Sequence, residues 1–385
     1  MSSAPKAGGS NGGADASVEH PGIDPGLVET PVGYVDLERT RANARAVGEY
    51  AAEHGLRWRP HIKTHKSRRI AALQLEAGAR GLTVATPREA EVMATLTDDL
   101  LLAYPPVGAE KLARVVRLAA SVDLNVALDS AAVLRPLAEA AAVAGVTVGV
   151  IVEMDVGLGR VGVSGAAEVL ELARAAAALD GVAFRGIQFY PGHIRAPLEE
   201  QGESLRRVSD QVAAVLEALE SDGLGPEIVS GGSTPTLWRS HEIEGLTEIR
   251  SGSCIFFDRE GLELGVVEAG GLAYTVLATV VSTAVPGHAV IDAGSKALSK
   301  EARGGSEGYG FVLDHPEVLV SGLSEEHGVL DLDTTSWRPT VGERVRVVPN
   351  HVCVSVNLQD ALLAKDGGVH EWISLEARGR GPWSD

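Results

Sequence analysis

Short apolar runs alternate with amphipathic segments over the chain from residue 57 to residue 251. Segments such as 66–77 and 203–220 carry apolar residues at helical spacing, and the runs between them have the length and character of strands. This alternation is typical of βαβ units, whose strands are parallel. The predicted strands lie at about 57–63, 81–86, 99–104, 124–129, 147–154, 183–190, 226–231 and 247–251. Eight such strands with intervening helices predict a closed (β/α)8 barrel.

The pattern changes after residue 265. Runs such as LAYTVLATVVSTAV (272–285) and RVRVVPNHVCVSV (344–356) are β-rich, and Gly, Pro and acidic turns separate them. We therefore expect an α/β protein in which a barrel over 25–265 is followed by a mainly β domain over 266–385. The strand-like run at 28–37 is a candidate to join the β domain. Residues 1–24 are rich in Gly, Ser, Ala and Pro, and we expect a disordered tail there.

Composition excludes several classes of function. The formal net charge is −18, from 34 basic and 52 acidic residues, which argues against a nucleic-acid partner because phosphate binding needs a basic face. The most apolar stretch, 131–154, is interrupted by Arg135 and Glu139, so we expect no membrane span. Two cysteines are too few for a disulfide framework, and residues 1–24 lack the apolar segment of a secretory signal, so we expect a cytoplasmic protein.

Glycine-rich loops follow the last two predicted strands. Gly231 and Gly232 allow a ligand to approach the backbone closely, and Thr234-Pro235 starts the next helix, so that free amides point at the gap. Gly252 and Ser253 end the neighbouring strand, and barrels often bind phosphate at these two positions. We interpret the loops as a phosphate site; the alternative is an ordinary strand-to-helix turn.

Lys63 ends the first predicted strand. Strand alternation places Arg59, His61 and Lys63 on one face, and closure of the barrel would turn that face inward. A lysine opposite a phosphate site on one barrel rim suits pyridoxal 5′-phosphate (PLP), which needs an amine to form an imine and an anion site at its other end. The alternative is a solvated surface lysine.

His351 and Cys353 lie two residues apart in a predicted β run, so their side chains are expected to share a face. An imidazole and a thiolate together can bind Zn²⁺ and leave coordination positions for water or substrate. The alternative is a buried cysteine with a hydrogen-bonded histidine.

Several of these segments together resemble one family. RPHIKTHKS (59–67), SGGSTPT (230–236) and PNHVC (349–353), with DVGLGRVGV (155–163) and IDAGSKALS (291–299), resemble the D-serine dehydratase and D-threonine aldolase family. Members are PLP-dependent lyases with an alanine-racemase-like barrel and a C-terminal β domain. The resemblance extends from about residue 28 to the end of the chain.

The resemblance implies a role for each matching residue. It makes Lys63, and not Lys66, the Schiff-base lysine, and it makes His351 and Cys353 the ligands of Zn²⁺ or another divalent metal. Arg160 and Tyr190 would contact the cofactor. The phosphate-binding residues would be Ser230, Gly231, Gly232, Ser233, Thr234, Gly252 and Ser253. Family members are commonly homodimers, so we expect one here.

Two reactions are open to a β-hydroxy D-amino acid in such a site. Loss of the α-proton and then of the hydroxyl gives an enamine and then a keto acid and ammonia, whereas cleavage between Cα and Cβ gives glycine and an aldehyde. The His-x-Cys pair resembles the dehydratases, whereas aldolases are associated with His-x-Asp, so we predict a D-serine dehydratase-like lyase. Lys63 would take the α-proton, and His193 or His65 would handle the proton near the hydroxyl. D-threonine aldolase-like cleavage, an amino-acid racemase and a non-catalytic PLP-binding protein remain alternatives.

Overall fold

The computed structural model describes residues 23–302 and 307–380. Most of the predicted tail, 1–22, lies outside these ranges, as do residues 303–306 of the Gly-rich segment at 300–310. The prediction of a tail is wrong for its last two residues. The amide of Ile23 donates to the carbonyl of His370 at 3.1 Å, and Asp24 accepts from Gly26 and so caps the short helix η1 (Pro25–Leu27).

The predicted parallel barrel is confirmed. Its eight strands are all parallel and follow the order β2-β9-β8-β7-β6-β5-β4-β3. A parallel bridge between His61 and Thr83 joins the two ends of this order. The strands are β2 (Arg57–Trp58), β3 (Leu82–Val84), β4 (Asp99–Leu102), β5 (Asp123–Leu128), β6 (Val148–Met154), β7 (Val182–Phe189), β8 (Ile228–Gly231) and β9 (Glu248–Ile249).

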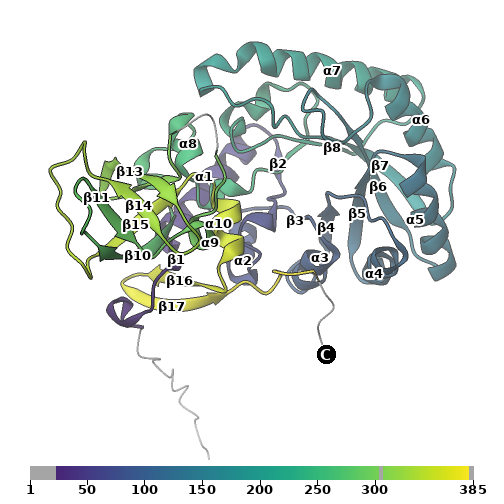
Figure 1. Ribbon diagram of the computed structural model, residues 1–385. Coiled ribbons are helices and arrows are strands. Elements are labelled where there is room, and N and C mark those ends of the chain that lie inside the picture. Colours follow the sequence, from purple (N-terminus) through teal and green to yellow (C-terminus); the bar gives the residue numbers. More distant parts are fainter. Residues whose placement is uncertain (1–22, 303–306, 381–385) are drawn as a thin grey trace, which may run out of the picture.

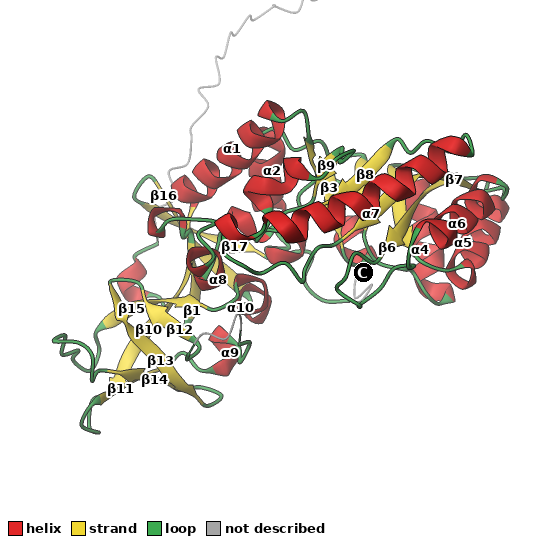
Figure 2. Ribbon diagram, turned by 90° about the horizontal axis from the view of Figure 1, so that it is seen from above, coloured by secondary structure: helices red, strands yellow, loops and turns green. Residues whose placement is uncertain are grey.

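Amphipathic helices cover the outside of these strands (Figures 1 and 2). In the longest, α7 (Gly202–Ser221), Leu205, Val208 and Val212 recur at helical spacing and are buried. The others are α1 (Leu37–Glu53), α2 (Arg68–Glu76), α3 (Pro87–Met93), α4 (Ala109–Ala119), α5 (Ala131–Ala144) and α6 (Ala166–Ala177), followed by the short α8 (Arg259–Glu263). Among the described residues, none of the helices is both long and apolar enough to cross a membrane.

A second, nine-stranded sheet lies beside the barrel (Figure 1). Its order is β11-β14-β13-β12-β15-β10-β1-β16-β17, so the early strand β1 (Val32–Asp36) pairs with β10 and β16 of this sheet. Its other strands are β10 (Tyr274–Ser282), β11 (His288–Ile291), β12 (Gly310–Val312), β13 (His315–Leu323), β14 (Gly328–Asp331), β15 (Arg344–Pro349), β16 (Ala361–Asp366) and β17 (Val369–Ser374). Two short helices, α9 (Ser295–Leu298) and α10 (Val352–Leu358), interrupt the β pattern.

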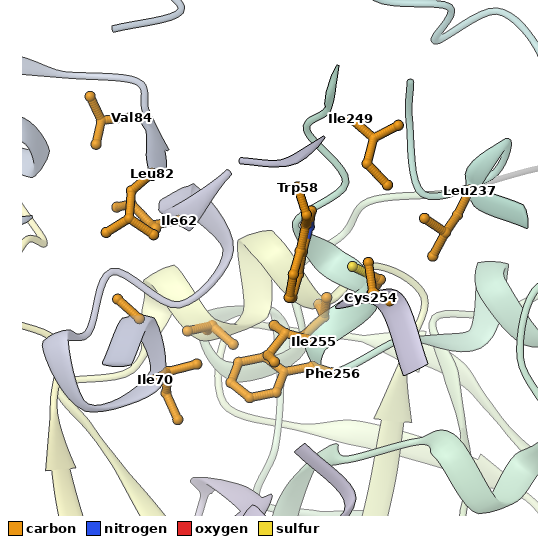
Figure 3. Close-up of a cluster of buried hydrophobic side chains, with 14 of the residues drawn as sticks. Trp58, Ile62, Ile70, Leu82, Val84, Leu237, Ile249, Cys254, Ile255 and Phe256 are labelled. Carbon is orange, nitrogen blue, oxygen red and sulfur yellow. The ribbon is translucent and has the colours of Figure 1, made fainter. Parts of the chain in front are cut away.

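A buried apolar cluster lies beneath the loops that follow β2 and β9 (Figure 3). Trp58 is 1% exposed, and its indole Nε1 donates to the carbonyl of Ser251 at 3.1 Å, which ties the end of β2 to the loop after β9. Ile62, Ile255 and Phe256 are fully buried in the same cluster. Because side chains in such a core are close-packed, the cluster fixes the backbone on either side of Lys63 and Gly252.

Candidate active site

One cavity of about 890 Å³ opens at the carboxyl ends of the barrel strands. Residues that follow β2, β6, β7, β8 and β9 line it, and so do His351 and Cys353 from the second domain. The wall contributed by α10 is in contact with η2 (Ile62–Thr64), the turn that carries Lys63. A ligand in this cavity would therefore touch both parts of the chain.

Lys63 lines this cavity, although it does so from a turn and not from a strand. β2 ends at Trp58, five residues earlier than the predicted strand; His61 then makes an isolated parallel bridge to Thr83, and the chain enters η2 at Ile62. The Nζ atom of Lys63 lies 5.9 Å from the centroid of the Tyr190 ring. His61 lines the cavity as expected, but Arg59 does not.

Two basic residues near Lys63 in the sequence, Arg59 and Lys66, are paired with carboxylates and do not line the cavity. Arg59 is 2% exposed and pairs with Asp99 and with Glu248, whose carboxylate lies 3.1 Å from its Nε. Lys66 lies 3.0 Å from the carboxylate of Glu89, which is fully buried. Of Lys63 and Lys66, only Lys63 lines the cavity.

The phosphate loops reach the cavity only in part. Gly232, Ser233, Thr234, Gly252 and Ser253 line it. The hydroxyl of Ser253 donates to that of Thr234 at 2.9 Å and so links the two loops.

Ser230 and Gly231 are not among the lining residues, so the structure does not bring these two expected phosphate-binding residues to the cavity. The hydroxyl of Ser230 donates to Glu248 at 2.7 Å, and a Cβ on Gly231 would point at the ring of Phe189. Both residues belong to β8 and face the interior of the protein.

Arg250 is a lining residue that the sequence reading did not single out. Its guanidinium donates to the hydroxyl of Ser230 at 2.7 Å and to the carbonyl of Phe189 at 2.8 Å, and burial lowers its pKa. Arg250 directly precedes the predicted phosphate loop at 251–253, and this position in the sequence could have identified it as a residue of the site. Arg160 and Tyr190 both line the cavity, with the guanidinium carbon 4.8 Å from the ring centroid.

His351 and Cys353 also line the cavity, but helix geometry and not strand alternation brings them there. His351 is the N-cap residue of α10, and Cys353 lies in its first turn. Burial lowers the pKa of His351, but Cys353 and Asp258 outweigh it and raise that pKa to about 10. Burial raises the pKa of Cys353, but the nearby His351 and Lys63 outweigh it and lower that pKa below its usual value. The pair therefore favours a thiolate, the form that binds metal.

The two histidines expected to handle protons do not line the cavity. His65 is fully buried, where its Nε2 lies 3.0 Å from the side chain of Gln74 and its Nδ1 accepts from the amide of Ser67. His193 is exposed, and its ring lies over Gly157. The burial of His65 does not suit a group that must reach a ligand at Lys63, whereas the exposed His193 directly follows Gly192, which lines the cavity.

The lining residues fit PLP and a metal ion in their chemistry. Within the described part of the chain, Nδ1 of His61 is buried and has no hydrogen-bond partner in the protein, so this wall of the cavity is incomplete without a polar ligand. A Cβ on Gly252 would lie 2.2 Å from the carbonyl oxygen of His61, so only glycine fits the space between the two loops. The imidazole and thiolate of His351 and Cys353 are donors that suit Zn²⁺.

Comparisons with known proteins match nearly the whole chain. Residues 35–260 match the family model described as alanine racemase, N-terminal domain, and residues 273–364 match a putative serine dehydratase domain. D-threonine aldolase from Arthrobacter sp. is 34% identical over 93% of this chain and 95% of its own length. D-threo-3-hydroxyaspartate dehydratase from Delftia sp. is 34% identical over 90% of this chain and 97% of its own.

Solved structures agree with these relatives. D-threonine aldolase from Filomicrobium marinum superposes with a TM-score of 0.85 at 32% identity, covering 93% of this chain and 98% of its own. The Delftia dehydratase superposes with a TM-score of 0.84 at 31% identity, covering 92% of this chain and 99% of its own, and a cysteine-to-alanine mutant of a D-threo-3-hydroxyaspartate dehydratase, solved in a metal-free form, also superposes at 0.84. The chain therefore belongs to the family of PLP-dependent D-amino-acid lyases with the alanine-racemase fold that includes D-threonine aldolase and D-serine dehydratase.

Proposed function

We propose that this lyase removes water from β-hydroxy D-amino acids to release an enamine, whose imine tautomer is then hydrolysed by water to a keto acid and ammonia. It would hold PLP at Lys63 and Zn²⁺, or another divalent metal, at His351 and Cys353. The observation that carries the proposal is that this imidazole–thiolate pair lines the same cavity as Lys63. A racemase has no need of a metal pair at that place.

The lining residues divide the work of the reaction. PLP, when bound, supplies an electron sink for the bond broken at Cα, and a divalent ion supplies Lewis acidity toward the β-hydroxyl. Lys63 anchors the cofactor and is placed to take the α-proton of the substrate. Gly232, Ser233, Thr234, Gly252 and Ser253 would hold the phosphate through their amides and hydroxyls, while Arg160 and Tyr190 would contact the rest of the cofactor.

His351 and Cys353 would position the hydroxyl that leaves. A thiolate is a soft ligand that favours Zn²⁺ over Mg²⁺ or Mn²⁺, which prefer oxygen ligands. His65 is fully buried beside Gln74 and is given no proton-handling role. The exposed His193, which follows the lining residue Gly192, stays the candidate to handle the proton near the hydroxyl.

Retro-aldol cleavage to glycine and an aldehyde is the second candidate. The Arthrobacter D-threonine aldolase and the Delftia dehydratase have the same sequence identity to this chain, 34%, so overall identity does not distinguish the two reactions. The thiolate in the donor pair favours dehydration, because the resemblance associates His-x-Asp with aldolases.

The proposal is tested by removing and restoring the metal. The purified protein, loaded with PLP, is treated with a chelator and then given Zn²⁺, and keto acid and ammonia are measured with D-serine, D-threonine and D-threo-3-hydroxyaspartate. Formation of both products should cease after chelation and return with Zn²⁺. Unchanged activity on metal-free protein, with interconversion of D- and L-isomers, would favour a racemase and contradict the proposal.

We further propose that the enzyme is a homodimer. Tyr104 and Val107 line the cavity and are 56% and 63% exposed, so they offer an apolar surface beside the polar site that a second copy of the chain would cover. Light scattering on the purified protein should give twice the chain mass, and a monomer at micromolar concentration would contradict this.

A further inference from the structure

Asp258 is a buried carboxylate behind the metal pair that sequence reading did not single out. It is the N-cap residue of α8 and is 5% exposed. Its Oδ1 accepts from the amide of Gly261 at 3.1 Å. Its Oδ2 accepts from the amide of Val352 at 3.0 Å and lies 2.9 Å from Nδ1 of His351. The side chain thus joins the start of α8, in the barrel domain, to the start of α10.

These contacts determine how His351 presents its ring. With Oδ2 as the acceptor, one proton of the ring stands on Nδ1, so a metal that binds the ring takes the place of the proton on Nε2. The amide of Val352 would otherwise be an unsatisfied donor in the first turn of α10, because His351 makes no side-chain capping bond. One carboxylate therefore fixes both the tautomer of His351 and the backbone that carries it.

A direct metal-binding role for Asp258 is the competing interpretation. Ligand atoms of Asp258, Glu260 and His351 lie within 4.8 Å of one another. However, the contact from Oδ2 to Nδ1 has the length of a hydrogen bond and the Oδ2 atom also accepts from Val352. Glu260 is paired with Arg195. Both carboxylates thus have partners within the protein. Glu260 lines the cavity with His351 and Cys353, whereas Asp258 lies behind them and is not a lining residue.

We infer that Asp258 is a positioning residue for the metal site: it orients His351 for coordination through Nε2 and does not bind the metal itself. The inference rests on the proposed metal site at His351 and Cys353, and it adds the residue that determines the affinity of that site. Carboxylates that orient metal-binding histidines typically contribute 10–100-fold to metal affinity.

The test measures Zn²⁺ affinity by competition with a chromophoric chelator, without any substrate. Asp258→Asn should weaken Zn²⁺ binding by about 10–100-fold while the PLP absorbance stays unchanged. Asp36→Asn is the matched control, because Asp36 also caps a helix, through the amide of Arg39, and is not a lining residue of the cavity. It should leave Zn²⁺ affinity unchanged, and the thermal stabilities of the two variants report any loss from capping alone.

Two further variants separate positioning from coordination. If Asp258 acts only through His351, then adding Asp258→Asn to His351→Ala should cause no further loss of Zn²⁺ affinity. With Co²⁺ in place of Zn²⁺, the Asp258→Asn protein should keep the absorption pattern of the wild-type site, including its thiolate-to-metal band.

Three results would overturn the inference: equal Zn²⁺ affinity of the wild type and Asp258→Asn, a further loss in the His351→Ala background, or a changed Co²⁺ pattern. A wild-type protein that binds no Zn²⁺ would overturn the proposed metal site as well, which distinguishes the two failures.

Discussion

At the scale of the residue, Lys63 and the metal pair owe their chemistry to their neighbours. Lys66 is engaged by the buried Glu89 and Arg59 by Asp99 and Glu248, whereas Lys63 lines the open cavity beside the Tyr190 ring. The same principle applies to His351 and Cys353, whose pKa values are shifted in opposite directions by each other's charge. The positions of Arg59, Lys63 and Lys66 in the sequence would not by themselves have shown which of them faces the cavity.

Lys63→Ala should abolish the imine absorbance of the PLP-loaded protein, because Lys111, the other lysine that lines the cavity among the described residues, has its Nζ beside the ring of Tyr104, 5.8 Å from the centroid, and not beside Tyr190. Lys66→Arg is the matched control: it keeps a cation opposite Glu89 but cannot form an imine, and it should retain the band. A band that survives in Lys63→Ala and disappears in Lys66→Arg would transfer the anchor to Lys66.

Cys353→Asp should reverse the metal preference of the protein. An aspartate replaces the soft thiolate with a hard oxygen ligand, so binding should shift from Zn²⁺ toward Mn²⁺ and Mg²⁺. The measurement is the ratio of dissociation constants for Zn²⁺ and Mn²⁺ in the wild type and the variant. An unchanged ratio would mean that the thiolate does not bind the metal.

At the scale of the element, close backbone approaches hold the loops of the cavity in place. Between the loop after β9 and the turn η2, Gly252 leaves no room for a Cβ beside the carbonyl of His61. Beneath them, the ion pairs of Arg59 connect β4 and β9 to the end of β2 inside the barrel. The close approach at Gly252 and the ion pairs of Arg59 both hold the backbone segment that carries Lys63.

Gly252→Ala should weaken PLP binding and lower the free energy of unfolding by about 1–3 kcal/mol, the usual cost of an overpacked site. The matched control is Gly225→Ala, where a Cβ would meet no atom within 4 Å. PLP affinity by absorbance titration and chemical denaturation measure the two effects. Equal behaviour of the two variants would contradict this account of the loop.

Arg59→Ala should lower the free energy of unfolding by about 3–5 kcal/mol, because it leaves the fully buried Glu248 without its cation. Arg80 also pairs with Asp99, at 3.5 Å, but its side chain is 65% exposed. Arg80→Ala should therefore cost no more than about 1 kcal/mol. Equal losses in the two variants would mean that burial does not determine the strength of these pairs.

At the scale of the whole molecule, the sequence predicted the architecture better than the details of the site. The alternation of apolar runs and amphipathic segments was enough to place every barrel strand, because burial on both faces leaves a strong signal. The same pattern extended the first strand too far, to Lys63. The turn η2 follows the pairing of His61 with Thr83 of β3, and this contact is visible only in the folded chain. The pattern also assigned His351 and Cys353 to a strand, where the short helix α10 is held by tertiary contacts such as that of Asp258 with Val352.

The misplaced site residues share one cause. Whether a polar side chain faces the cavity depends on the partners that the folded chain brings to it. Ser230 and His65 were expected at the cavity, but their side chains are hydrogen-bonded to Glu248 and Gln74. For the same reason Arg250 and Asp258 were missed, because their partners are visible only in the folded chain.

The identity of the products from D-threonine tests the central claim most directly, since both candidate reactions can act on this substrate. The PLP- and Zn²⁺-loaded protein is incubated with D-threonine, and the products are followed by proton NMR together with an ammonia assay. The proposed dehydration predicts 2-oxobutanoate and ammonia in equal amounts, formed only when metal is present. Glycine and acetaldehyde without ammonia would contradict it and establish retro-aldol cleavage instead.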